Sequence, residues 1–245
     1  MSPVASKTTY LLKLQDRYQV AERTMAFQFE KPEAFVFRAG QSIDMTLINP
    51  SETDAKGNRR AFSIASAPDD RLLLIATRMR DTAFKRTLAI MPIGTQVEVE
   101  GPFGDLTLHN DQARAAVFLA GGIGITPFMS ILLQAKREHR QHSLFCFYAN
   151  RRPEDAPFLQ ELEALHEPHV RTIVPTMTQM RPLDPSWEGE IGRIDHSMLA
   201  RHLKCAMSPI YYLAGPPGMV NGLRQMLKCA GVSNDDIRAE EFSGY

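Results

Sequence analysis

The stretch Arg60-Ala61-Phe62-Ser63-Ile64-Ala65-Ser66-Ala67-Pro68 decides how the rest of this 245-residue chain is interpreted. It offers a permanent cation, an aromatic ring, a hydroxyl and a run of small residues, in an order suited to a flat, phosphorylated ring system. A guanidinium can grip a pyrophosphate through two parallel hydrogen bonds, which a lysine cannot do. The stretch therefore predicts a site for a phosphorylated cofactor.

Two different patterns lie on either side of a boundary in the middle of the chain. Over residues 10–99, short segments with apolar residues at every second position are separated by turn residues, which is typical of a small barrel or sandwich. From residue 115 onward, short apolar segments alternate with helical stretches, which predicts a parallel sheet with helices on both faces. We expect two domains, residues 1–111 and residues 112–245.

The spacing of apolar residues also predicts individual elements. One helix is expected near residues 84–91, with Asp81 or Thr82 as its cap. In the second half, the expected strands are residues 115–119, 144–148, 170–175, 210–214 and 238–242, and the expected helices are residues 127–138, 157–166, 196–203 and 217–230.

Composition narrows the class of protein. Lysine and arginine (28) balance aspartate and glutamate (28), so nothing points to a nucleic-acid partner or an anionic membrane. Residues 1–9 lack the apolar core of a signal peptide, and no window is apolar enough to span a membrane, so we expect a cytoplasmic protein. The three cysteines and seven histidines have no metal-ligand spacing, so we expect no metal site and no iron-sulfur cluster in this chain.

Two glycine-rich stretches in the second half each follow an expected strand and precede an expected helix. The first is Gly121-Gly122-Ile123-Gly124-Ile125-Thr126-Pro127, and the second is Gly215-Pro216-Pro217-Gly218-Met219. Glycines let a dinucleotide approach the backbone, and the exposed N–H groups of a helix start suit its pyrophosphate. Proline is also favoured at the first position of a helix.

Together, the three stretches resemble the ferredoxin-NADP reductase superfamily, and the resemblance runs from about Tyr10 to the C-terminus. It implies an N-terminal antiparallel Greek-key β-barrel that binds FAD and a C-terminal α/β parallel-sheet domain that binds NAD(P)H. It also implies that a hydride passes from NAD(P)H to FAD. The electrons would then go to a separate acceptor protein, such as a ferredoxin, a flavodoxin or an oxygenase component, or to a small acceptor.

By this resemblance, Arg60 holds the flavin phosphates, Phe62 packs beside the isoalloxazine, and the Ser63 hydroxyl faces the reactive flavin nitrogen. Phe62 stands where tyrosine is commoner in the family, so a phenol hydrogen bond to the flavin is missing. Other residues implied in FAD binding are Ala61, Ala76, Thr77, Arg78, Thr82, Phe242 and Tyr245. Ser63, Glu240 and Phe242 are the implied catalytic residues.

The resemblance also implies the nicotinamide contacts. These are Gly121, Gly122, Gly124, Thr126, Pro127, Ala214, Gly215, Pro216, Pro217, Gly218 and Met219. Ala214 stands where the family usually has a cysteine. The segment Met177-Thr178-Gln179 lacks the serine-arginine pair with which family members often bind the 2′-phosphate of NADPH, and this favours NADH, although Arg151, Arg152 and Arg181 lie nearby in the sequence.

Two other functions fit the same residues. The chain could reduce free flavins, which relatives with a similar Arg-x-Phe-Ser motif do. It could also be a non-catalytic electron-relay subunit of a larger complex, which coelution with a partner would indicate. For the chain itself we expect a monomer.

Overall fold

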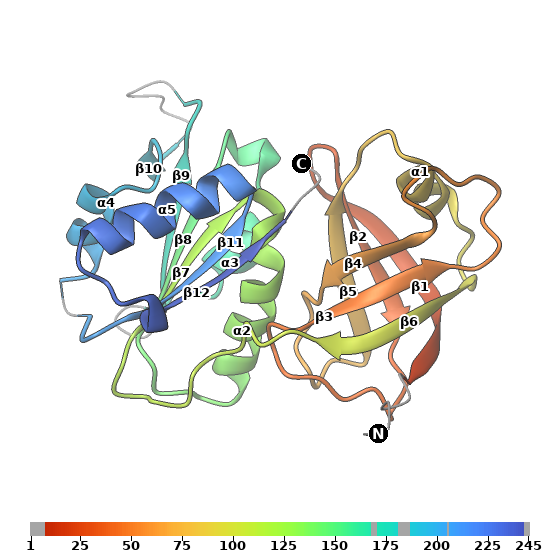
Figure 1. Ribbon diagram of the computed structural model, residues 1–245, viewed down its shortest axis with the longest axis horizontal. Helices are drawn as coiled ribbons and strands as arrows, with labels where there is room; N and C mark the ends of the chain where they lie inside the picture. The colour runs from red at the N-terminus through yellow and green to blue at the C-terminus, as the bar shows by residue number, and fades with distance from the viewer. Residues whose placement is uncertain (1–7, 168–170, 181–186, 205, 243–245) are drawn as a thin grey trace, which may run out of the picture.

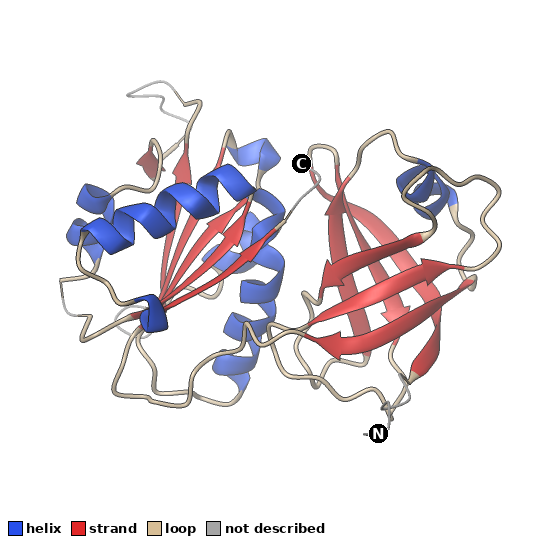
Figure 2. Ribbon diagram, in the orientation of Figure 1, coloured by secondary structure: helices blue, strands red, loops and turns tan. Residues whose placement is uncertain are grey.

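The computed structural model describes residues 8–167, 171–180, 187–204 and 206–242 (Figure 1). Two six-stranded sheets, one from each half of the chain, lie side by side (Figure 2). The N-terminal sheet is antiparallel, in the order β4-β3-β6-β1-β2-β5. Its elements are β1 (Thr9–Ala21), β2 (Thr24–Glu30), β3 (Ser42–Leu47), β4 (Arg59–Ser63), β5 (Leu72–Arg78), α1 (Ala83–Ile90) and β6 (Gln96–Phe103).

The antiparallel sheet closes on itself as the predicted barrel. Beyond β4, Ala65 donates its N–H to the Leu74 carbonyl on β5 at 2.8 Å, which links the two ends of the strand order. Strand β6 lies between β1 and β3, so sequence neighbours are separated in space as in a Greek key. Leu12 and Leu14 are fully buried, which confirms the alternation expected from the sequence.

The second sheet is parallel throughout, in the order β10-β9-β8-β7-β11-β12. Its strands are β7 (Ala116–Gly121), β8 (Leu144–Asn150), β9 (Arg171–Met177), β10 (Glu190–Ile191), β11 (Ile210–Gly215) and β12 (Ile237–Glu241). Its helices are α2 (Ile125–Arg137), α3 (Leu159–Glu163), α4 (His196–His202) and α5 (Pro217–Cys229), with short 3₁₀ turns η1 (Gly122–Gly124), η2 (Pro153–Asp155) and η3 (Asn234–Asp236).

Both faces of the parallel sheet are covered, as predicted. Phe118 and Ala120 on β7 belong to the core that includes α2 and α3, whereas Val117 and Leu119 belong to the core that includes α4 and α5. Alternate residues of β7 therefore pack into the cores on opposite faces of the sheet. In the described part of the chain, no helix is long and apolar enough to cross a membrane.

The observed bounds differ from the expected ones in three places. Helix α2 begins at Ile125, so Pro127 is its third residue and not its first. Helix α3 begins only at Leu159, because Phe158 before it adopts a left-handed conformation (φ 60°) that a helix cannot contain, and it ends at Glu163, before the predicted residue 166. The two-residue strand β10 was not predicted. Residue 170, at the start of one predicted strand, lies outside the described residues.

Helix α2 lies between the two sheets (Figure 1). Its residues from Ile125 to Leu132 are all buried, and its core includes Ala65 and Ala76 of the barrel as well as strand β7. The Ser130 hydroxyl donates to the Ser66 carbonyl at 2.6 Å. The helix is therefore shared by both halves of the chain.

The connection between the sheets is fixed by a small polar cluster. His109 Nε2 lies 3.1 Å from the Arg114 carbonyl, and its Nδ1 lies 2.9 Å from the Tyr212 hydroxyl. Because a carbonyl only accepts, Nε2 carries the hydrogen and Nδ1 accepts from Tyr212. His142 Nε2 donates in the same way to the His109 carbonyl at 2.9 Å. The boundary at residues 111 and 112, which we keep as a proposal, falls within this connection.

Candidate functional site

Arg60 lies on the inner side of β4, next to helix α1. Its guanidinium donates to the carbonyls of Lys56 and Gly57 at 2.8 and 3.0 Å, and its centre lies 5.2 Å from the centroid of the Phe84 ring. The neighbouring Arg59 points to the outside of the barrel, where it pairs with Asp44 and Glu100. Because successive side chains of a strand point to opposite faces of the sheet, these two neighbouring arginines lie on opposite sides of β4.

A carboxylate already contacts the Arg60 guanidinium. Asp54 Oδ1 lies 3.2 Å from Arg60 Nη2. Hydrogen bonding from the Lys56 N–H lowers the pKa of Asp54, and the Arg60 charge and the Ala83 N–H at the start of α1 lower it further. An anion is therefore stable where Arg60 and the first turn of α1 meet, which is where the sequence predicts the flavin phosphates.

Ser63 ends β4 with its hydroxyl buried and unsatisfied. The side chain is 4% exposed, and Ser63 Oγ has no hydrogen-bond partner among the described residues. A buried hydroxyl without a partner costs free energy, so it marks a place where a ligand atom would be favourable. Phe62, one residue earlier, packs 5.9 Å from Phe84, centroid to centroid.

The other predicted flavin residues surround this position on β5 and α1. Ala76 and Thr77 are buried near the end of β5, and the Arg78 guanidinium lies 3.9 Å from the Asp155 carboxylate of the second half. Thr82 caps helix α1 and accepts from the Lys85 N–H at 3.3 Å, which confirms the predicted cap. Ala61 is exposed on β4.

The two glycine turns pack directly against each other at the carboxyl ends of β7 and β11. A Cβ on Gly215 would lie 3.2 Å from three backbone atoms of Gly121, and a Cβ on Gly124 would lie 2.2 Å from the Ala214 carbonyl oxygen. Side chains cannot fit at these positions. The glycines therefore bring two strand-to-helix turns together, at the edge where parallel sheets bind ligands.

A cleft of about 940 Å³ runs from the barrel to these turns. Predicted residues along it are Arg78, Gly121, Gly122, Pro216, Gly218 and Met219. Thr126 and Pro127 are buried inside α2, where the Thr126 hydroxyl donates to the Ile123 carbonyl at 3.0 Å. They and Gly124, Ala214, Gly215 and Pro217 are not among the residues that line the cleft.

Sequence reasoning missed several residues of the cleft. Asn150 is buried, and its side-chain Nδ2 has no partner among the described residues. Arg193 was missed as well, and it lines the same cleft as Thr178 and Arg151, which the sequence had already placed near the 2′-phosphate position of NADPH. Asn150 stands at the carboxyl end of β8, so the rule that ligands bind at this edge could have singled it out.

The predicted C-terminal residues lie beside the second glycine turn. Glu240 on β12 is paired with Ala214, and the Phe242 N–H donates to the Gly215 carbonyl at 3.0 Å. Burial raises the pKa of Glu240, and the nearby Asp105 carboxylate raises it further. Tyr245, predicted to contact the flavin, lies outside the described residues.

The residues present suit a flavin dinucleotide. Arg60 and the α1 N-terminus provide donors for phosphate, and the unsatisfied Ser63 hydroxyl provides a buried polar contact near an aromatic wall. The cleft runs from Arg78 at the end of β5 to the two glycine turns. A nicotinamide held by the glycine turns would therefore face the flavin side of the barrel.

Comparisons with known proteins agree with this geometry. A model of the family described as oxidoreductase NAD-binding domain matches residues 118–225. The chain is 30% identical over 228 residues to ferredoxin–NADP reductase B of Sorangium cellulosum, covering 90% of this chain and 91% of that protein. It is 26% identical to the glycine betaine monooxygenase reductase subunit of Chromohalobacter salexigens, covering 94% of this chain but only 62% of that protein.

Solved structures share the whole fold. A ferredoxin NADP⁺ reductase from Neisseria gonorrhoeae with bound FAD and NADP superposes with a TM-score of 0.78 at 23% identity, covering 95% of this chain and 98% of that one. A cytochrome P450 reductase from Amycolatopsis superposes with a TM-score of 0.79 at 22% identity, covering 97% of this chain and 71% of that one. At these identities the likeness concerns the fold.

The contact between the glycine turns predicts the effect of a single methyl group. Gly124→Ala should lower the free energy of unfolding by about 1–3 kcal/mol, because the Cβ must displace backbone of the neighbouring turn. Gly222→Ala, inside helix α5 with open space around it, should instead raise it by up to about 1 kcal/mol. Urea denaturation measures both, and equal effects of the two variants would contradict the packing.

Proposed function

This chain belongs to the ferredoxin-NADP reductase family of NAD(P)H-dependent FAD oxidoreductases, and we propose that it passes electrons from NAD(P)H through FAD to a separate acceptor protein. The observation that carries the proposal is the cleft that joins Arg78 of the barrel to the paired glycine turns. A reductase of this kind needs both cofactors at one junction, and the cleft provides it.

In this proposal the barrel residues hold and orient the flavin. Arg60 and the first turn of α1 bind its phosphates, Phe62 provides an apolar wall, and the Ser63 hydroxyl offers a hydrogen bond at the ring. When bound, the flavin supplies the redox chemistry, and the protein contributes position and electrostatics. Burial around Ser63 also keeps water away from the ring.

The second half presents the nicotinamide. Gly121 and Gly122 line the cleft and would let the dinucleotide approach the backbone closely, with Met219 beside them. Glu240 follows the same edge of the sheet, and burial, which raises the pKa of its carboxyl, favours the protonated form. Phe242, hydrogen-bonded to Gly215, is positioned to cover the approach to the flavin.

For the acceptor we propose a separate redox protein, a ferredoxin, a flavodoxin or an oxygenase component. The relatives named as a ferredoxin–NADP reductase and as a monooxygenase reductase subunit support this class. An anaerobic titration with NADH and with NADPH, followed by visible spectroscopy, tests the first half-reaction directly.

The nicotinamide preference is proposed from two arginines. Arg151 and Arg193 both line the cleft beside Thr178, and within the described part of the chain neither forms an ion pair with a carboxylate. Two cations without acidic partners favour an anion, and the 2′-phosphate distinguishes NADPH from NADH. We therefore propose NADPH, in contrast to the NADH favoured by the Met177-Thr178-Gln179 segment alone.

Removal of the Arg60 cation should release the flavin. A charge-assisted hydrogen bond to phosphate contributes roughly 1.5–3 kcal/mol, so Arg60→Ala should weaken FAD binding by about ten- to a hundredfold. Arg59→Ala is the matched control, because Arg59 lies outside the barrel and should leave the yellow colour unchanged. Full flavin occupancy of Arg60→Ala at dilute concentration would refute the assignment.

The double variant Arg151→Ala/Arg193→Ala should lose NADPH selectively. We expect kcat/KM for NADPH to fall by about ten- to a hundredfold, with a change below about threefold for NADH, since charged hydrogen bonds contribute roughly 1.5–3 kcal/mol. Arg140→Ala, which removes an exposed arginine paired with Glu138, serves as the control. A parallel loss with both nucleotides would exclude a 2′-phosphate contact.

Removal of Phe242 to Tyr245 should change nicotinamide binding much more than flavin retention. An aromatic ring that stacks on the flavin competes with nicotinamide by on the order of 1 kcal/mol, so deletion should tighten apparent NAD(P)H binding severalfold. Stopped-flow flavin reduction measures the affinity and the hydride-transfer rate. If both stay at the wild-type values, the tail has no gating role.

A further inference from the structure

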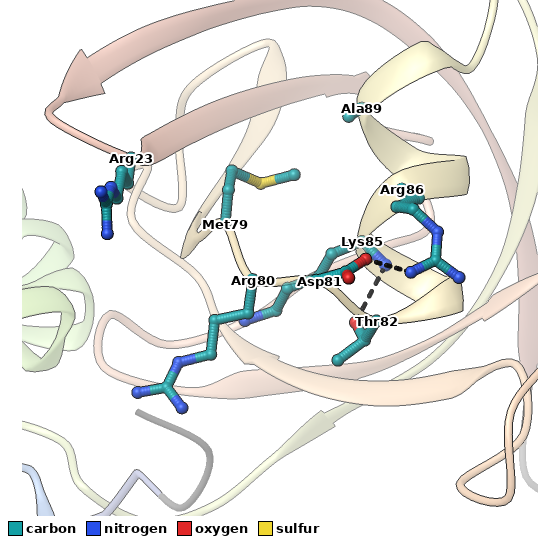
Figure 3. Close-up of a pocket in the computed structure, with 8 residues that line it drawn as sticks. All are labelled: Arg23, Met79, Arg80, Asp81, Thr82, Lys85, Arg86 and Ala89. Atoms are coloured by element: carbon teal, nitrogen blue, oxygen red, sulfur yellow. Dashed lines mark hydrogen bonds and ion pairs between the residues drawn. The ribbon is translucent and has the colours of Figure 1, made fainter.

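A second hollow, of about 770 Å³, opens beside the start of helix α1 (Figure 3). It is lined by Arg23, Met79, Arg80, Asp81, Thr82, Lys85, Arg86 and Ala89. The only carboxylate in this set, Asp81, pairs with Arg86. Glu52 from outside the hollow also pairs with Arg86. The remaining cations, Arg23, Arg80 and Lys85, therefore have no free carboxylate among the residues that line the hollow.

Lys85 is the cation of the hollow whose charged form is disfavoured by its surroundings. Its Nζ donates to the Arg78 carbonyl at 2.6 Å, and no ion pair joins it to a carboxylate in the part of the chain that the structure describes. The side chain is half-buried. Burial lowers the pKa of Lys85 to about 8, and repulsion from Arg80 and Arg60 acts in the same direction.

The position of Lys85 on helix α1 also disfavours its charged form. It is the third residue of α1, near the positive end of the helix dipole, where acidic residues are favoured and basic ones are not. No acidic residue occupies this first turn. Beside two arginines and a helix N-terminus, and with a neutral carbonyl as its hydrogen-bond acceptor, the Lys85 ammonium would be stabilised further by an anion.

A flavin dinucleotide bound to the barrel would supply such an anion. Thr82, the cap of α1, lines the same hollow as Lys85, and Arg60 lies close enough to Lys85 to repel its charge. These are the two residues expected at the flavin phosphates. We propose that Lys85 binds a phosphate of the flavin dinucleotide, and that flavin binding therefore places a proton on this lysine. The inference rests on the proposed function, because it requires that the barrel binds FAD.

The other charged groups near Lys85 would not take up a proton near pH 8 when FAD binds. They are Arg23 from the β1–β2 turn, Arg80, Asp81 and Arg86 from the α1 region, and Arg60 with Asp54 from β4 and the loop before it. Arginines stay protonated at every pH of interest, and carboxylates paired with arginine stay ionised near pH 8. Lysine is the group of this set that titrates there.

Isothermal titration of FAD into flavin-depleted protein tests the proposal. Measured in two buffers of different ionisation enthalpy, binding should take up about half a proton at pH 8 and nearly one at pH 9, given a free-state pKa of about 8. The dissociation constant should be about tenfold higher at pH 9 than at pH 7. Absence of proton uptake by a protein that binds FAD would overturn the role of Lys85 and leave the proposed function intact.

Two variants separate charge from proton transfer. Lys85→Arg should bind FAD with no proton uptake and no pH dependence over this range, because its guanidinium does not titrate. Lys85→Met should also take up no proton, and should bind FAD about tenfold more weakly at pH 7. Lys136→Met, on exposed α2 surface, should behave as wild type. Uptake that persists in Lys85→Met would refute the proposal.

The stability of the flavin-free protein gives a readout independent of activity. Because the folded state disfavours charged Lys85, its lowered pKa makes the free protein more stable as the pH rises from about 8 toward the unfolded value near 10.4. Lys85→Met should raise the melting temperature at pH 7 while it weakens FAD binding. A variant that is both less stable and weaker in binding would indicate a merely structural lysine. Wild-type protein that binds no FAD at all would overturn the proposed function together with this inference.

Discussion

The burial of helix α2 between the two sheets is the constraint on which the rest of the structure depends. An ordinary surface helix buries one face, but the residues of α2 from Ile125 to Leu132 are all buried, because the parallel sheet covers one side and the barrel the other. The hydrogen bond from Ser130 to the Ser66 carbonyl ties this helix to the stretch that carries Arg60 and Ser63. The first glycine turn leads directly into α2, so one helix fixes the distance between the two cofactor regions.

Around this helix, both cofactor regions use the same physical arrangement. In each, a strand ends, a turn follows and a new helix begins, α1 in the barrel and α2 after the first glycine turn, and the N–H groups of a helix start favour an anion. The two regions differ in what makes room for the ligand. In the barrel, side chains offer the donors, whereas in the second half the missing side chains of Gly124 and Gly215 let backbone segments meet.

The sequence predicted these elements where local rules dominate. Period-two alternation located the barrel strands, and Thr82 capped its helix, because both depend on neighbouring residues alone. Arg193 was missed because its environment comes from segments distant in sequence: it lines the same cleft as Asn150 only through the order of the parallel strands. Helix α3 was predicted too long because the left-handed Phe158 is set by tertiary packing of its buried ring.

The cluster of His109 and His142 makes the connection between the two sheets sensitive to acid. Burial lowers the pKa of both His109 and His142, so the fold favours neutral rings. Protonated His109 could no longer accept from Tyr212, and protonated His142 would place an N–H at Nδ1, which has no partner among the described residues. The stability that the two neutral rings contribute to the fold is therefore complete above about pH 6.5, and it is lost as the pH falls through their lowered pKa values. Mild acid therefore weakens the hydrogen bonds that hold the connection against Tyr212 of β11.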